Sequence, residues 1–216
     1  MALIGVAAVA TAAFVVGVAE RRSRDHVVTA GFWFDRVTYE SPALTEALGG
    51  ALTEPERATV RAGARREVEQ AFAPWRLRVA DQQSAHYRVR VVQAFPPRRG
   101  PGAMAVAESH TFGPLGGIGA VSFATVASLA VAHAPPGTTR AALVEAIGRG
   151  VGRVAAHELA HQILPLKNFH ASSDEASYDF EAANRTSQFY GAVHWDLAAS
   201  WLEGALGRRE PARAAP

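Results

Sequence analysis

The chain has 216 residues, enough for one domain that buries a hydrophobic core without disulfide bonds. Lys and Arg together number 22 and Asp and Glu 20, and the basic residues are scattered along the chain, which argues against nucleic acid as a partner. Cysteine is absent, so any metal must be held by histidine and carboxylate side chains and not by a cysteine cluster.

The first feature along the chain is an uncharged run rich in Ala and Val, residues 2–19, which a cluster of arginines follows. Its length is close to the minimum for crossing a bilayer, and its small C-terminal residues also fit a signal peptide. We therefore expect residues 1–24 to be a hydrophobic anchor or signal segment, with membrane association through residues 2–19 or export. Lys167 is the only lysine, a bias towards arginine that favours a GC-rich bacterium and hence a bacterial cell envelope.

Residues 25–206 are expected to form one domain, with residues 207–216 as a flexible tail. β-branched and aromatic residues predict strands at 26–34, 37–39, 76–80, 85–95, 103–108 and 118–126. A capping box of Thr53 and Glu56 begins a helix over 54–73, and Thr138 or Thr139 begins another over 140–164, which Pro165 ends. This pattern predicts an α+β domain, close to α/β, with a mixed twisted sheet, one backing helix and one active-site helix.

A Gly-rich stretch at 113–119 joins two of these strands. It lacks the Gly-Lys-Ser/Thr ending of a phosphate-binding loop, and no helix follows at the required offset. A mobile turn beside an edge strand is therefore favoured over nucleotide binding.

The segment His157-Glu158-Leu159-Ala160-His161 lies in the last two turns of the second predicted helix. Residues four apart on a helix project from one face, so the two imidazoles can bind a single Zn²⁺. Glu158 is displaced by one position, which places its carboxylate near a water on the metal, where it can act as general base. The segment therefore predicts zinc-dependent hydrolysis.

A third zinc ligand must come from elsewhere in the chain. His170 is favoured, because Pro165 ends the helix and the following residues are just long enough to turn the chain back towards the metal. The alternative is a carboxylate of the gluzincin type, Glu181 or Glu175, with Asp179 orienting a ligand histidine. Asp174 is a further candidate, and His194 is interpreted as a structural or pocket-wall histidine.

His157 to His161 followed by His170 resembles the metzincin clan of zinc metallopeptidases, and most closely bacterial proteins related to archaemetzincins. The spacing departs from the usual pattern, which would place glycine at 164 and the third histidine at 167, where this chain has Leu164 and Lys167. The methionine of the turn beneath the zinc is also missing, and Val193 takes its position.

The resemblance implies that a peptide or protein substrate pairs with an edge strand, here one of those flanking 113–119, and that Tyr178 or Tyr190 donates a hydrogen bond to the oxyanion. The expected activity is peptide-bond hydrolysis by a zinc-activated water, with Glu158 as general base and His157, His161 and His170 as ligands. The competing class is a non-catalytic, membrane-anchored metal-binding module. The sequence carries no signal for the oligomeric state.

Overall fold

The computed structural model describes residues 27–96, 106–112, 115–165, 167 and 170–210. The anchor or signal expected at residues 1–24 lies outside them. Among the residues described, no helix combines the length and the apolar character needed to cross a membrane.

The described part of the chain combines five strands with helices of very different lengths. The strands are β1 (Val28–Phe34), β2 (Leu77–Ala80), β3 (Tyr87–Val92), β4 (Ala107–Thr111) and β5 (Gly117–Ser122). The helices are α2 (Pro42–Leu48), α3 (Glu54–Ala71), α4 (Phe123–Ala132), α5 (Arg140–Ile163), α6 (Ser187–Tyr190) and α7 (Ala198–Leu206). The two longest, α3 and α5, are the two that the sequence predicts.

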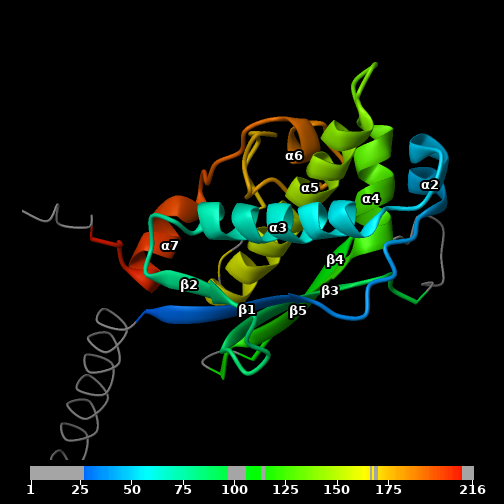
Figure 1. Cartoon of the computed structure of the whole chain (residues 1–216). Coiled ribbons are helices and arrows are strands. Elements are labelled where there is room, and N and C mark those ends of the chain that lie inside the picture. The colour runs from blue at the N-terminus through cyan, green and yellow to red at the C-terminus, as the bar shows by residue number, and fades with distance from the viewer. Residues whose placement is uncertain (1–26, 97–105, 113–114, 166, 168–169, 211–216) are drawn as a thin grey trace, which may run out of the picture.

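The strands form one mixed sheet in the order β2-β1-β3-β5-β4, in which only β4 runs antiparallel to its neighbour. Helices α3 and α5 lie over the same face of this sheet, and α5 passes behind α3 in Figure 1. The core lies between the two layers and includes Phe32, Val89 and Leu159, all at most 2% exposed. The α+β class with a mixed sheet and two long helices is therefore confirmed.

Helices α3 and α5 approach each other closely because small residues line their contact. A Cβ at Gly152 would lie 2.4 Å from the carbonyl oxygen of Ala64, and one at Gly148 would lie 2.9 Å from that of Val60. Contacts this short do not occur for real side chains, so only glycine fits at these two positions. Helix α3 thereby fixes the position of α5 over the sheet.

Replacing Gly152 by Ala is expected to lower the free energy of unfolding by about 1–3 kcal/mol, because the two helices must move apart. Gly204 in α7 is a matched control, since a Cβ there has no neighbour within 4 Å. Gly204→Ala should raise the free energy of unfolding by up to about 1 kcal/mol through helix propensity. Urea unfolding of both variants measures the two effects, and equal effects would contradict this account of the contact.

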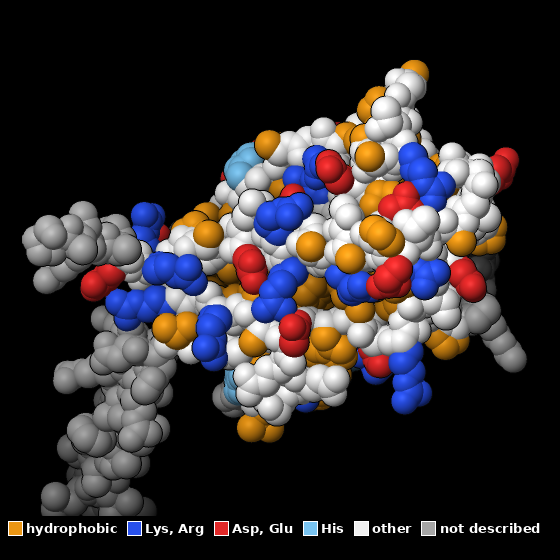
Figure 2. Space-filling model, viewed as in Figure 1, with side chains coloured by type: hydrophobic (Ala, Val, Ile, Leu, Met, Phe, Trp, Pro, Cys, Tyr) orange, Lys and Arg blue, Asp and Glu red, His pale blue; other side chains and the backbone are white. Residues whose placement is uncertain are grey.

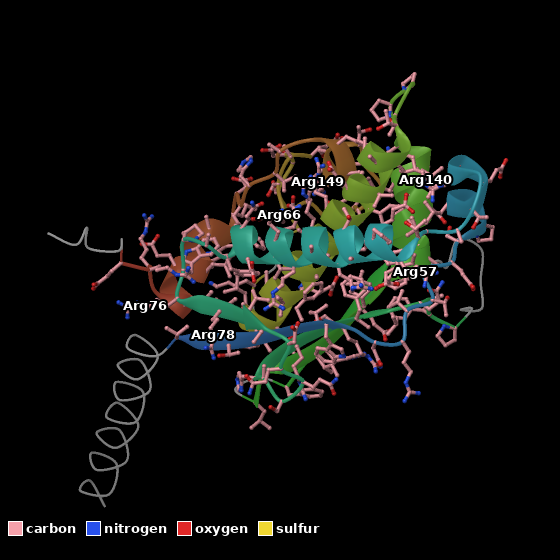
Figure 3. The ribbon with its side chains drawn as sticks, in the orientation of Figure 1. Arg57, Arg66, Arg76, Arg78, Arg140 and Arg149 are labelled. Atoms are coloured by element: carbon pink, nitrogen blue, oxygen red, sulfur yellow. The ribbon has the colours of Figure 1, made fainter. Side chains whose placement is uncertain are left out.

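The N-terminal ends of α3 and α5 are tied together by one carboxylate. Glu56 accepts hydrogen bonds from the backbone and side chain of Thr53, completing the predicted capping box. It also accepts two hydrogen bonds from the guanidinium of Arg140, the first residue of α5, which Figure 3 labels. These bonds lower the pKa of Glu56 to about 2. Over the rest of this face, basic and acidic side chains are interspersed (Figure 2).

Several parts of the chain differ from the sequence expectation: residues 37–39 form no strand, and helices α6 and α7 were not predicted. Helix α2 was not predicted, and the strand expected at 118–126 ends at Ser122, whose hydroxyl accepts a hydrogen bond from the amide of Thr125 and begins α4. Only Thr125 and Ser128 are polar in the run 123–132, so the spacing of its apolar residues does not separate strand from helix. The tail expected from residue 207 is bound as far as Arg209, whose amide donates to the carbonyl of Pro74.

Candidate metal centre

Helix α5 delivers the predicted motif to the edge of the sheet. Its C-terminal half packs against β3, β5 and β4, and Glu158 and Leu159 are buried there. The hydroxyl of Ser109 on β4 donates a hydrogen bond of 3.3 Å to the carbonyl of Glu158. The motif therefore lies beside the edge strand β4, and this hydrogen bond fixes the position of α5 relative to that strand.

The side chain of Gln162 anchors the last turn of α5 to the sheet. Its amide accepts from the backbone N–H of Arg88 at 2.9 Å and donates to the carbonyl of Arg88 at 3.0 Å. A Cβ at Gly117 would lie 2.5 Å from Cγ of Gln162, so the glycine makes room for this side chain. The Gly-rich stretch thus begins strand β5 and receives Gln162, a role that its composition alone did not reveal.

Replacing Gln162 by Leu is expected to lower the free energy of unfolding by about 2–4 kcal/mol, because it leaves the partly buried N–H and C=O of Arg88 without their partner. Gln162→Glu retains an acceptor but introduces a charge into a site that is 1% exposed, so it should also destabilise the protein. Thermal unfolding of both variants tests this, and a Tm unchanged in Gln162→Leu would contradict it.

Three imidazoles converge next to this anchor. Nε2 of His157 lies 3.1 Å from Nε2 of His161 and 3.0 Å from Nε2 of His170, and the last two atoms are 2.8 Å apart. Ligand nitrogens on a tetrahedral zinc ion with bonds of 2.0–2.1 Å are separated by about 3.3 Å, which is close to these distances. Converging lone pairs repel one another unless a cation lies between them. His157, His161 and His170 could therefore hold a metal ion.

The orientation of His157 also suits a ligand. Nδ1 lies 2.6 Å from the carbonyl oxygen of Tyr178, so the proton sits on Nδ1 and Nε2 keeps its lone pair. Burial lowers the pKa of His157 to about 3, although the bond to Tyr178 acts in the opposite direction. Burial likewise lowers the pKa of His161 to about 4. Both rings are thus neutral at physiological pH, which is the form that binds metal.

Glu158 is 9% exposed and lines the same cavity as the three histidines. Burial raises the pKa of its carboxyl group to about 7, and the nearby charge of Glu108 acts in the same direction. A carboxyl group with this pKa can both accept and release a proton near neutral pH.

No model of a known protein family matches the chain, and no curated protein does. The interpretation of the site therefore depends on its geometry. A partly buried histidine triad, with His157 and His161 on a long helix above a mixed five-stranded sheet, is consistent with a zincin-like site.

The other candidate ligands are not part of the triad. Glu181 is exposed and lines the cavity, but the group of metal-ligating side chains found among the described residues contains only the three histidines. Glu175 is exposed. Nε2 of His194 lies 3.2 Å from a carboxylate oxygen of Asp174, so these two residues pair with each other.

Asp179 does not orient a ligand histidine through the contacts observed. Its carboxylate accepts from the backbone N–H groups of Asp196 and Ala198 at the start of α7. The hydroxyl of Tyr190 donates to the carbonyl of Ala130, which is 2.8 Å away. Val193 lines a neighbouring cavity and not the one with the triad. Tyr178 lines both cavities, and its backbone carbonyl, not its hydroxyl, makes the contact with His157.

The cavity around the triad has a volume of about 320 Å³ and includes two residues that the sequence reasoning missed. Arg153 and Arg185 line it and are only 5% and 6% exposed. Arg153 could have been found, because it precedes His157 by the same four positions that separate His157 from His161. No pattern in the sequence marks Arg185.

Proposed function

We propose that the protein is a zinc-dependent peptidase, with His157, His161 and His170 as metal ligands and Glu158 as general base. The observation that carries the proposal is the convergence of three Nε2 atoms within 3.1 Å of one another, beside a buried carboxyl group. An all-imidazole set is common at zinc sites and leaves the fourth position of a tetrahedral ion for water. The donor set therefore fits zinc.

A zinc ion bound there would lower the pKa of a coordinated water and polarise the scissile carbonyl. Glu158 accepts a proton from the attacking water and later donates it to the nitrogen of the leaving amine, as the C–N bond breaks. Its pKa of about 7 suits both transfers. The hydrogen bond from His157 to Tyr178 keeps the imidazole in one tautomer and one orientation.

Strand β4 supports a peptide as the substrate. It forms the edge of the sheet, and Ala107 at its start lines the cavity together with the triad. An extended peptide can add to such an edge through backbone hydrogen bonds, which brings its carbonyl groups past the metal centre. We also propose that the enzyme is located at a bacterial cell envelope, through residues 2–19.

The proposal is tested on the purified full-length chain by two measurements. Metal content by mass spectrometry should show about one zinc ion per chain. Cleavage of a peptide library should stop on adding a chelator and return on adding zinc. Bound zinc without cleavage would favour the alternative, a non-catalytic metal-binding module, and a chain that retains no metal would overturn both.

A further inference from the structure

Arg153 lines the cavity of the triad, as well as the neighbouring cavity, from the same face of α5 as His157 and His161. It lies one turn before His157, and side chains four positions apart on a helix have Cβ atoms about 5–6 Å apart. An extended peptide advances by about 3.3 Å per residue. A substrate whose scissile bond lies at the triad therefore has a group one or two residues away beside Arg153.

The guanidinium of Arg153 has N–H donors beyond those that its protein partners use. Nε donates to a carboxylate oxygen of Glu67 at 3.1 Å, and Nη1 donates to the carbonyl of Ser187 at 2.7 Å. Among the residues that the structure describes, Nη2 has no hydrogen-bond partner. A buried arginine has five N–H groups to satisfy, so donors are left for a bound molecule.

Arg149, Arg153 and Arg185 carry more positive charge than the carboxylates in direct contact with them. Glu67, the carboxylate partner of Arg153, is shared with Arg149, whose Nε lies 4.0 Å from the other oxygen. Arg185 donates to three backbone carbonyls and to the side-chain oxygen of Gln188, and in the described part of the chain no carboxylate lies within 4.0 Å of it. Burial lowers the pKa of Arg185 to about 10, although the charges of Glu175 and Asp174 act in the opposite direction, and the group stays charged at neutral pH.

Buried positive charge without a matching anion is costly, and it is stabilised when an anion binds. Glu181 lines the same cavity, but it is exposed and forms no ion pair with either arginine. Gln188, whose side-chain oxygen accepts a hydrogen bond from Arg185, also lines the cavity. A substrate carboxylate can therefore replace this oxygen as the acceptor. The end of the cavity around Arg153 thus has the chemistry of a carboxylate-binding site.

We propose that Arg153, together with Arg185, binds a carboxylate of the substrate one or two residues from the scissile bond. This inference rests on the proposed peptidase function. A guanidinium and a carboxylate can form two parallel hydrogen bonds, which makes the pairing both strong and selective. Two sources supply the same group: the side chain of Glu or Asp within a peptide, and the free C-terminus of a peptide that ends at this point.

The test measures binding separately from cleavage. Dissociation constants of fluorescent peptides are measured on the zinc-loaded Glu158→Gln chain, which should not hydrolyse them. One arm compares Glu with Gln at each position of peptides blocked at both ends, and a second compares a free C-terminus with its amide in peptides without acidic residues. In one arm, the peptide with the carboxylate should bind at least about 10-fold more tightly than its neutral counterpart, as expected for a charge-assisted pair. That arm shows whether the carboxylate comes from a side chain or from the C-terminus.

Arg153→Gln is introduced into the same Glu158→Gln chain. The ratio of the dissociation constants of the neutral peptide and the carboxylate peptide should then be close to one. Arg149→Gln is the matched control, because Arg149 (labelled in Figure 3) contacts Glu67 but does not line the cavity. The control should keep the preference. If Arg153→Gln does not fold, Arg153→Lys keeps the charge but loses the paired hydrogen bonds, and the preference should fall in part.

Equal affinities in both arms would overturn the inference, as would a preference that survives Arg153→Gln. These results are distinct from failure of the proposed function. Cleavage by the unmodified chain without any preference for a carboxylate leaves the peptidase standing and removes the subsite. A preference that depends on Arg153 in a chain that never cleaves peptides leaves the subsite standing and removes the peptidase.

Discussion

Replacing Glu158 by Gln is expected to lower the rate of peptide hydrolysis by about 100- to 10,000-fold, because the amide cannot accept the proton of the attacking water. Zinc should stay bound, since Glu158 is not among the three converging histidines. The amide has nearly the shape of the carboxylate and removes a group whose pKa burial raises to about 7, so the fold should be retained. Steady-state kinetics and metal content on the same sample separate the two effects.

Glu181→Gln is the matched control for this variant. Glu181 lines the same cavity but is exposed, so its loss should change the hydrolysis rate by no more than a few-fold. Full activity in Glu158→Gln would exclude Glu158 as the general base. Loss of zinc from Glu158→Gln would instead mean that the carboxylate is a ligand.

Replacing His170 by Ala is expected to weaken zinc binding by at least about 100-fold, since loss of even an outer partner of a ligand costs 10- to 100-fold. Removing one of three nitrogens leaves His157 and His161, which as a pair on one helix cannot complete a tetrahedral site. Competition with a fluorescent chelator measures the affinity. Hydrolysis should be lost in proportion to the bound zinc.

His194→Ala serves as the control for His170→Ala. His194 pairs with Asp174 on an exposed surface, so this variant should keep its zinc. If His170→Ala retains stoichiometric zinc while Glu181→Ala releases it, the third ligand is a carboxylate and the site is of the gluzincin type.

The long elements of the fold were predictable because their local signals agree. The capping box at Thr53 and the periodicity that follows predict α3, and the threonines before Arg140 together with Pro165 bound α5. Helix α2 was missed because it is short and buries only Leu44, and α4 was missed because its sequence is apolar at most positions, so neither sequence shows a clear helical period. The order of the strands was not predictable either, since β3 pairs with β5, which is distant in the sequence.

The candidate site was predictable where one helix builds it and uncertain where loops do. His157, Glu158 and His161 follow from helical geometry alone. The position of His170 depends on how the chain turns after Pro165, which spacing constrains only loosely. The carbonyl of Tyr178 was not predictable, because any residue could provide a backbone oxygen and only the tertiary fold places this one against His157.

The anchoring of α5 by Gln162 has a consequence for how the protein behaves when metal is removed. The amide hydrogen of Arg88 is bound to a buried side chain whose position depends on the packing of α5 and on Gly117. Its exchange with solvent should therefore require opening of the whole helix-sheet interface. We expect this amide to exchange slowly even without zinc, and more slowly with it, which would mean that α5 presents His157 and His161 already in place to an arriving ion.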